Sequence, residues 1–145
     1  MKLTIEQSPL IKEPEVVIRC AVIDEHIQWI IDGVNRDTHT LPVRLNDTSK
    51  IIPIKDICYF ESVDEKSFVY CENEVYSTDL RLYEIEELLK DSDFVRVSKA
   101  CILNIDVVDR VRAQLNGKLE ALLQNGERLI INRHYVPGFK RKYGL

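Results

Sequence analysis

The sequence lacks long apolar runs and has few residues that break a fold. In its 145 residues no apolar stretch approaches the roughly 18 residues that a membrane-spanning helix needs. Residues 1–15 also lack the basic and then apolar order of a secretion signal. With five Gly, five Pro and 45% apolar residues, the composition is neither collagen-like nor that of a disordered chain. We therefore expect one or two small folded domains in the cytoplasm.

The four cysteines are too widely spaced for paired-thiol chemistry. Cys20, Cys58, Cys71 and Cys101 form no Cys-x-x-Cys pair and have no neighbouring histidine, which argues against a metal site. We interpret them as reduced thiols in strands. For Cys101, which lies close to Lys99, an effect of oxidation on binding is a second interpretation.

Catalytic motifs are scarce as well. The histidines His26, His39 and His134 lie far apart, and the chain has neither a G-x-S-x-G motif nor a glycine-rich phosphate loop. Many carboxylates gather in one amphipathic segment, where solvation explains them. We predict that the protein is not an enzyme and needs no cofactor or metal.

Positive charge is unevenly distributed. Residues 94–145 carry ten Lys and Arg against four Asp and Glu, a net charge of +6. Residues 1–93 carry ten against twenty, a net of −10, so the whole chain has a net charge of −4. Clustered basic side chains displace the counterions condensed on phosphates, and that release favours binding to a polyanion. The alternative is a solvated strand surface that happens to be rich in basic residues.

The first 45 residues predict a small strand and helix segment. Residues 15–20 (EVVIRC) are rich in β-branched side chains. From Asp24, which is placed to cap a helix, apolar residues recur at helical spacing, and Trp29 falls off that stripe. We place a loose domain boundary near Asn46, which separates residues 1–45 from residues 46–145.

The C-terminal part predicts a mainly β, α+β fold of antiparallel sheets with one packing helix. Short segments rich in Val, Ile, Tyr and Phe predict strands at residues 41–45, 50–54, 57–62, 67–72 and 75–78. Residues 79–90 (DLRLYEIEELLK) predict a helix that turns Leu80, Tyr83, Ile85, Leu88 and Leu89 mostly to one face. Its acidic face would be repelled by phosphates, so we expect it to pack on a sheet and not to read DNA.

Two Asn-Gly pairs predict tight antiparallel hairpins near the C-terminus. Asn116-Gly117 would join strands at 108–115 and 118–123, and Asn125-Gly126 would lead into a strand at 128–132, because Asn-Gly accepts the positive φ angles of such turns. In the first hairpin, alternation predicts that Val111, Ala113 and Leu115 face inward.

Several sequence blocks occur in a fixed order in this region. They are YFES at 59–62, LYEIEELL at 82–89, FVRVSKACILN at 94–104 and NGERLIINRHYV at 125–136. Residues from about 50 to 145 thereby resemble the LytTR family of bacterial DNA-binding domains. The resemblance implies an elongated set of small antiparallel sheets without a helix-turn-helix, which contacts successive major grooves of double-stranded DNA through loops. It implies a sequence-specific transcription regulator.

The resemblance also implies which side chains reach DNA from three loops. The matching base-reading residues are Lys66, Ser67, Lys99 and Arg133. Contacts of Arg or Lys to guanine discriminate bases by about 1–3 kcal/mol. The residues expected to hold phosphates are Ser98, Asn132, His134 and Lys140. For Arg96, a strand residue paired with an acid and a DNA contact are equally open interpretations.

Most LytTR domains follow a receiver domain, yet about 45 residues are too few for that fold. The chain resembles stand-alone members, which are often controlled by a small membrane protein. Trp29 and the apolar stripe of residues 23–34 lead us to expect that the first 45 residues form a homodimer or bind such a membrane partner. The competing function is a protein-interaction module whose basic face docks an acidic or membrane-associated partner. RNA binding is less favoured because the basic region lacks a ladder of aromatic residues.

Overall fold

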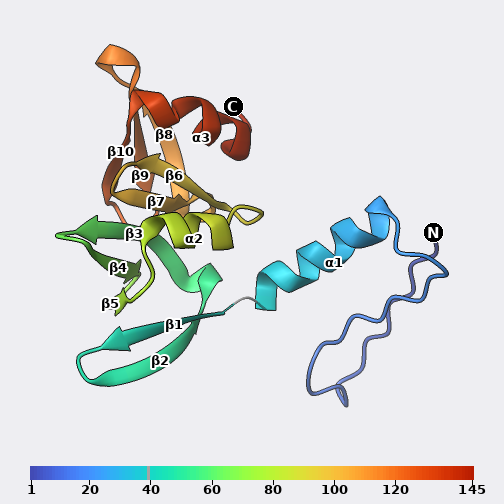
Figure 1. The fold of residues 1–145 in the computed structure, drawn as a ribbon. Coiled ribbons are helices and arrows are strands. Elements are labelled where there is room, and N and C mark those ends of the chain that lie inside the picture. The colour runs from blue at the N-terminus through green and yellow to red at the C-terminus, as the bar shows by residue number, and fades with distance from the viewer. Residues whose placement is uncertain (39) are drawn as a thin grey trace. The chain divides into compact units, whose positions relative to one another are not determined.

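The computed structural model describes residues 1–38 and 40–145, and the side chains of all of these except 36–38. His39 lies outside the described residues. The chain divides into two units, Met1–Arg36 and Asp37–Leu145, and each is described by itself (Figure 1). The division comes before the boundary expected near Asn46, because strand β1 (Thr40–Leu45) pairs with two strands of the second unit.

The N-terminal unit contains helix α1 (Glu25–Thr38). Asp24 caps it as expected: its Oδ1 accepts a hydrogen bond from the Ile27 N–H at 2.9 Å. The strand expected at residues 15–20 is wrong, since no residue of that stretch belongs to a strand. Among residues 1–35, whose side chains are described, none is buried, and Trp29 is 71% exposed.

The C-terminal unit contains a seven-stranded antiparallel sheet in the order β2-β1-β5-β4-β3-β7-β6. Its other strands are β2 (Thr48–Pro53), β3 (Ile57–Val63), β4 (Lys66–Cys71), β5 (Val75–Thr78), β6 (Phe94–Ser98) and β7 (Cys101–Asn104). The five strands expected between residues 41 and 78 are confirmed to within two residues at each end.

A second sheet has the order β10-β9-β8. Its strands are β8 (Val108–Ala113), β9 (Leu119–Leu123) and β10 (Arg128–Ile131). The Asn116-Gly117 turn is confirmed, with φ of 67° and 73°. The inward orientation expected for Ala113 and Leu115 is wrong. Ala113 is exposed at the end of β8, and Leu115 is 88% exposed because the chain enters a short 3₁₀ turn at Leu115–Gly117.

Two helices accompany the sheets. Helix α2 (Leu82–Leu88) is shorter than expected. Its buried residues are Leu82 and Ile85, and Leu89, which follows the helix, is buried with them. Tyr83 and Leu88, which were expected on the inner face, are exposed. Helix α3 (Val136–Tyr143) was not predicted. Its early proline fits the first turn of a helix, and Gly144 ends it with a φ of 91°.

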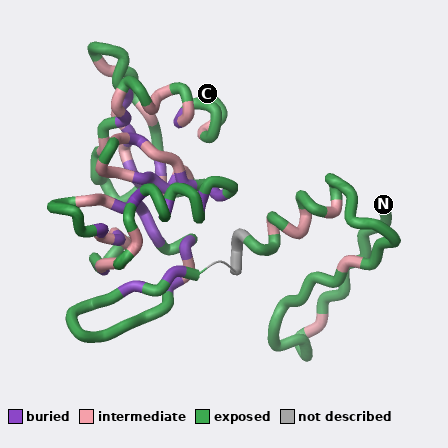
Figure 2. The backbone as a smooth tube through the Cα atoms, in the orientation of Figure 1, coloured by how far each residue is buried: buried purple, intermediate pink, exposed green. Residues whose placement is uncertain are grey.

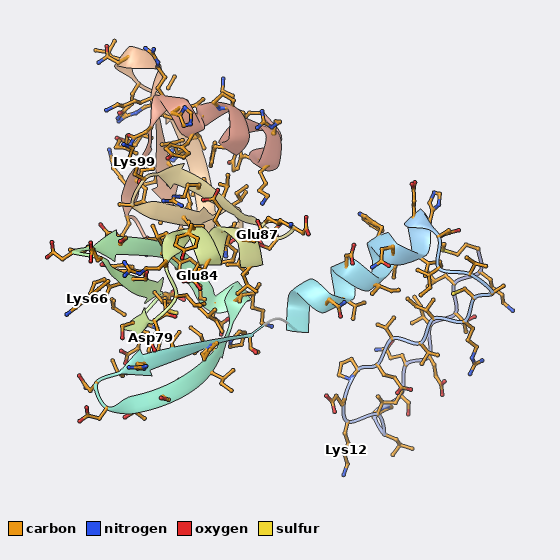
Figure 3. All side chains as sticks on the ribbon, viewed as in Figure 1. Lys12, Lys66, Asp79, Glu84, Glu87 and Lys99 are labelled. Carbon is orange, nitrogen blue, oxygen red and sulfur yellow. The ribbon has the colours of Figure 1, made fainter. Side chains whose placement is uncertain are left out.

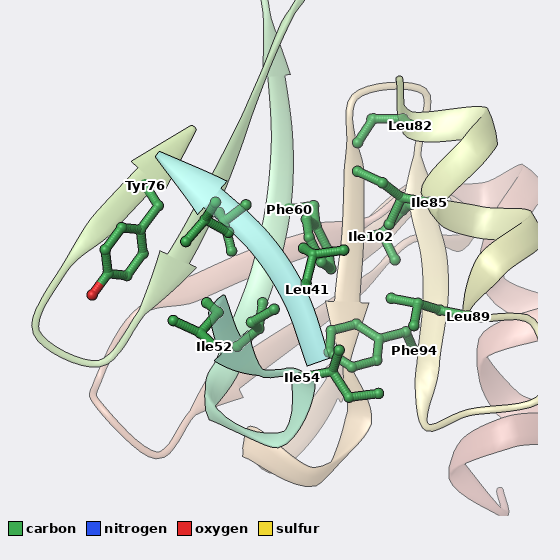
Figure 4. Packing of buried hydrophobic residues seen from close by; sticks show 13 residues of the cluster. Leu41, Ile52, Ile54, Phe60, Tyr76, Leu82, Ile85, Leu89, Phe94 and Ile102 are labelled. Atoms are coloured by element: carbon green, nitrogen blue, oxygen red, sulfur yellow. The ribbon is translucent and has the colours of Figure 1, made fainter. Parts of the chain in front are cut away.

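The central strands are buried on both faces, so the unit has two cores (Figure 2). Successive strand residues point to opposite faces. Phe60 of β3 and Ile102 of β7 therefore pack in a first core beneath α2 (Figure 4). Their neighbours Tyr59 and Leu103 pack in a second core with the small sheet and with Phe139 of α3. The turns that leave β3, β6 and β7 are thus anchored on rigid strands.

Candidate nucleic-acid interface

Backbone hydrogen bonds hold three distant loops together at one edge of the C-terminal unit. The Ser62 N–H donates to the Ala100 carbonyl at 2.8 Å, which joins the end of β3 to the β6–β7 turn. The Asn132 N–H donates to the Val97 carbonyl at 2.9 Å, which joins β6 to the segment after β10. Together with the 116–117 turn, residues 63–66, 98–101 and 132–134 form what we call the loop edge.

Arg96 fixes the conformation of the β6–β7 turn. Its Nε donates to the Ser98 carbonyl at 2.8 Å, and its Nη2 donates to the Lys99 carbonyl. Its Nη1 pairs with the Glu86 carboxylate of α2 at 2.7 Å. The side chain is 19% exposed. The pairing of Arg96 with an acid is confirmed, and its donors are used inside the protein.

Two of the expected phosphate ligands also shape their turns. The Ser98 hydroxyl accepts a hydrogen bond from the Ala100 N–H at 3.2 Å, and the Asn132 carbonyl accepts one from the Tyr135 N–H at 2.8 Å. Both side chains are half-buried, whereas Lys99 at the tip of the turn is exposed. The side chain that projects farthest into solvent from this turn is therefore that of Lys99.

Arg133 lies against a turn that sequence reasoning did not connect to it. A Cβ added to Gly117 would stand 2.9 Å from the Arg133 Cδ and 3.1 Å from its Cγ. The aliphatic stem of Arg133 therefore rests on the backbone of the hairpin turn, while the residue as a whole stays exposed. The Asn-Gly pair was interpreted as a hairpin signal alone, and no local pattern links it to a residue sixteen positions later.

Gly117→Ala is expected to move Arg133 as well as strain the turn. A positive φ costs a non-glycine residue about 1–2 kcal/mol in free energy of unfolding. Gly126→Ala is the matched control, because Gly126 also has a positive φ of 90° but nothing lies within 4 Å of its added Cβ. Denaturant unfolding should show similar losses for both variants, and DNA binding should weaken for Gly117→Ala alone. Equal DNA affinities would show that the Gly117 contact does not position Arg133.

The remaining expected residues lie in different settings. Lys66 is exposed, next to the Asp64 and Glu65 turn, and Figure 3 shows it on the same side of the unit as Lys99. Ser67 is 3% exposed, covered between its cross-strand partners on β3 and β5, so its expected reach to a base is not supported. His134 is exposed, with its ring edge-on to Tyr135 at 5.0 Å.

Lys140 does not belong to the loop edge. It is exposed on α3, a separate element, beside Arg141 and Lys142. The structure thus brings Ser98, Lys99, Asn132, Arg133 and His134 together, places Lys66 at the adjoining turn and leaves Lys140 on a basic helix.

The Cys101 thiol is poorly suited to redox control. Burial, followed by the nearby Glu61 carboxylate, raises its pKa to about 12, so the thiol stays protonated near neutral pH. Within the described residues, no cluster of three or more His, Cys, Asp or Glu side chains could hold a metal ion. The same residues include no helix long and apolar enough to cross a membrane.

Comparison with known proteins settles the family. Residues 47–144 match the LytTr DNA-binding domain. The chain belongs to the LytTR family. Over its whole length it is 26% identical to an uncharacterized HTH-type transcriptional regulator of Staphylococcus aureus (strain bovine RF122 / ET3-1), with 99% of that protein covered. An uncharacterized HTH-type transcriptional regulator of Staphylococcus aureus (strain MRSA252) is 25% identical over 147 residues.

The LytTR fold is also found by structural similarity. The LytTr DNA-binding domain of a putative methyl-accepting/DNA response regulator from Bacillus cereus superposes with a TM-score of 0.69 and 23% identity. The match covers 73% of this chain and 97% of that chain. The expected fold of antiparallel sheets is confirmed, and the chain carries a DNA-binding domain of the LytTR family. Although its relatives are named HTH-type, five strands separate α2 from α3 in this LytTR unit.

Proposed function

We propose that this LytTR protein binds specific sites on double-stranded DNA and places its loop edge in successive major grooves of repeated sites. The observation that carries the proposal is the backbone pairing of Ser62 with Ala100 and of Val97 with Asn132, which presents exposed cationic side chains from separate loops on one edge. A preorganised set of donors loses little conformational entropy on binding.

The side chains of the loop edge differ in what they can recognise. Arg133 offers a planar pair of donors suited to guanine O6 and N7, and Lys99 and Lys66 offer point charges to a base edge. Ser98, Asn132, His134 and Lys140 would bind phosphates and set the register without reading sequence. Ser67 is left out of this assignment because it is buried. No step needs a cofactor or catalysis, and a regulator of chromosomal genes would work in the cytoplasm.

Salt dependence separates this function from docking to an acidic protein. The logarithm of the binding constant for a duplex should fall linearly with the logarithm of salt concentration, with a slope of about −0.9 for each phosphate neutralised. Fluorescence anisotropy with duplexes selected from a random pool would measure the slope and the preference together. A flat response, or equal affinity for selected and scrambled duplexes, would favour the protein-docking function.

We further propose that the N-terminal unit joins two copies of the chain, or holds the chain on a small membrane-protein regulator. A unit of 36 residues in which none of the described side chains, those of residues 1–35, is buried has too little core to be stable alone. Its exposed apolar residues, Trp29 among them, would gain burial in such a contact. We expect light scattering to show a dimer that becomes a monomer when residues 1–36 are deleted or when Trp29 is replaced by Ala. A monomeric full chain would exclude self-association and leave the membrane partner.

A further inference from the structure

A cleft lies between α2 and α3 and borders the loop edge at His134. It has a volume of about 560 Å³, within the range of roughly 300–1,000 Å³ typical of small-molecule sites. Its apolar lining includes Leu89 just after α2, Phe94 of β6 and Ile102 of β7, which also belong to the first core. The cleft therefore has a rigid apolar floor.

Cationic side chains dominate the walls of the cleft. Lys90, Arg96, Arg141 and Lys142 line it, and Glu86 is the acid among the lining residues that the structure describes. The Glu86 carboxylate is neutralised by Arg96 at 2.7 Å. Lys90 is likewise paired with Glu87, so the positive charge left above the apolar floor is that of Arg141 and Lys142, and it favours a negatively charged ligand.

Arg141 is the cation best placed to meet such a ligand. It is exposed, and its Nη2 lies 3.7 Å from the position of a Cβ on Gly138, so the side chain folds back along α3 toward the cleft. The other cations are engaged: Lys90 with the Glu87 carboxylate at 2.8 Å, and Lys142 with the Phe94 carbonyl at 2.6 Å. Within the described part of the chain, Arg141 has no ion pair.

Lys142 holds the two walls together. Its ammonium donates to the carbonyls of Lys90 at 3.0 Å and of Phe94 at 2.6 Å, which fixes the last turn of α3 to the connection between α2 and β6. The cleft is therefore a feature of the folded unit that exists before any ligand binds.

We propose that the α2–α3 cleft binds a small amphipathic anion, a carboxylate, sulfonate or phosphate monoester with an apolar body. The anionic group binds the Arg141 guanidinium, whose planar fork suits two acceptor oxygens. The apolar body packs on the more accessible apolar lining, Tyr135 and Pro137, above the buried floor of Leu89, Phe94 and Ile102.

Two residues connect the cleft to the loop edge, and this step rests on the proposed function. His134 lines the cleft and belongs to the loop edge, and Arg96 lines the cleft while holding the Lys99 turn. An anion in the cleft lies close to the place where a DNA phosphate would meet His134. The ligand therefore competes with DNA and releases the regulator from its sites.

The probe for the cleft is 1-anilinonaphthalene-8-sulfonate, an aromatic sulfonate, added to the full chain without DNA. We expect one saturable site, with amide chemical-shift changes at Leu89, Phe94 and Gly138. Arg141→Gln should weaken binding about tenfold, as expected for loss of a charge-assisted hydrogen bond. Gly138→Leu should abolish it by filling the cleft, and the added Cβ meets the Arg141 Nη2 at an ordinary 3.7 Å, so the variant should fold.

Arg110→Gln is the matched control, because Arg110 is an exposed arginine on the small sheet that does not line this cleft. Its dye affinity should equal that of the wild type. The uncharged N-phenyl-1-naphthylamine should bind more weakly than the sulfonate. Dye binding that survives Arg141→Gln and Gly138→Leu, or shifts confined to residues 1–36, overturns the site. So does the absence of saturable binding at millimolar dye.

A second experiment adds a duplex that was selected from a random pool for binding to the protein. Saturating dye should lower duplex affinity for the wild type and leave it unchanged for Gly138→Leu. Dye bound in the cleft with unaltered duplex affinity overturns the competition. Failure of the proposed function would give a different result. The protein would then show no preference for the selected duplex, with or without dye, while dye binding without DNA would still report on the cleft.

Discussion

Arg133→Ala is expected to abolish most of the preference for a selected duplex over a scrambled one, while leaving affinity for the scrambled duplex nearly unchanged. A bidentate guanidinium contact to guanine is worth about 1–3 kcal/mol of discrimination, on the order of a tenfold to hundredfold change in the ratio of Kd values. Arg133 can make that contact because its stem is braced on Gly117 and the residue is exposed. Anisotropy titrations with both duplexes measure the ratio directly.

Lys140→Ala is the control for this result, because it tests phosphate binding that does not depend on sequence. Lys140 lies on α3 among other basic residues, where an ammonium can neutralise a phosphate of any sequence. Its loss should weaken both duplexes alike and reduce the salt slope by about 0.9. If Arg133→Ala and Lys140→Ala produce the same losses on selected and scrambled duplexes, the division into base reading and phosphate binding is wrong.

Elements that depend on local chemistry could be predicted from the sequence. Strand β3 and the Asn116-Gly117 turn are each predicted by the types of a few consecutive residues, and both are confirmed. Helix α3 carries a misleading signal, because Pro137 and Gly138 are typical of turns. Its stability comes from the burial of Phe139 in the second core, which is a tertiary effect.

The strand expected at residues 15–20 was a wrong prediction because its local signal was present but a pairing partner was not. Its residues suit a pleated surface, but β-propensity describes fitness for pairing and does not supply a partner. In the structure no strand of the N-terminal unit lies beside it. Ser67 shows a related limit: a small polar residue in a strand gives no sign of which face it occupies until its neighbours on both sides are known.

The candidate interface could be located from sequence only through the family resemblance. The bonds between Ser62 and Ala100 and between Val97 and Asn132 join residues 35 or more positions apart, and no local periodicity encodes them. Periodicity also left Arg96 undecided, because a basic residue in a strand can face water, an acid or DNA. The structure decides it by placing Glu86 of α2 within 2.7 Å.

Arg96→Met should reduce duplex affinity about tenfold even though Arg96 itself does not reach DNA. Methionine keeps most of the apolar volume but removes every donor, so the carbonyls of Ser98 and Lys99 lose their partner. Unsatisfied polar groups in a partly buried setting cost about 1–3 kcal/mol, and we expect a loss of free energy of unfolding at the lower end of that range. Glu86→Gln is the milder control, because the amide still accepts a hydrogen bond and the half-exposed ion pair is worth less than about 1 kcal/mol.

A double-mutant cycle separates an effect through Lys99 from general loosening of the fold. If Arg96 acts by positioning the Lys99 turn, a chain with both Arg96→Met and Lys99→Ala should bind a duplex no more weakly than Arg96→Met alone, because the contact made by Lys99 is already lost. The measurement is anisotropy at a temperature where denaturant curves show all four proteins folded. Strictly additive losses would show that Arg96 and Lys99 act independently, and Arg96 would then be a stabilising residue with no part in presenting the loop edge.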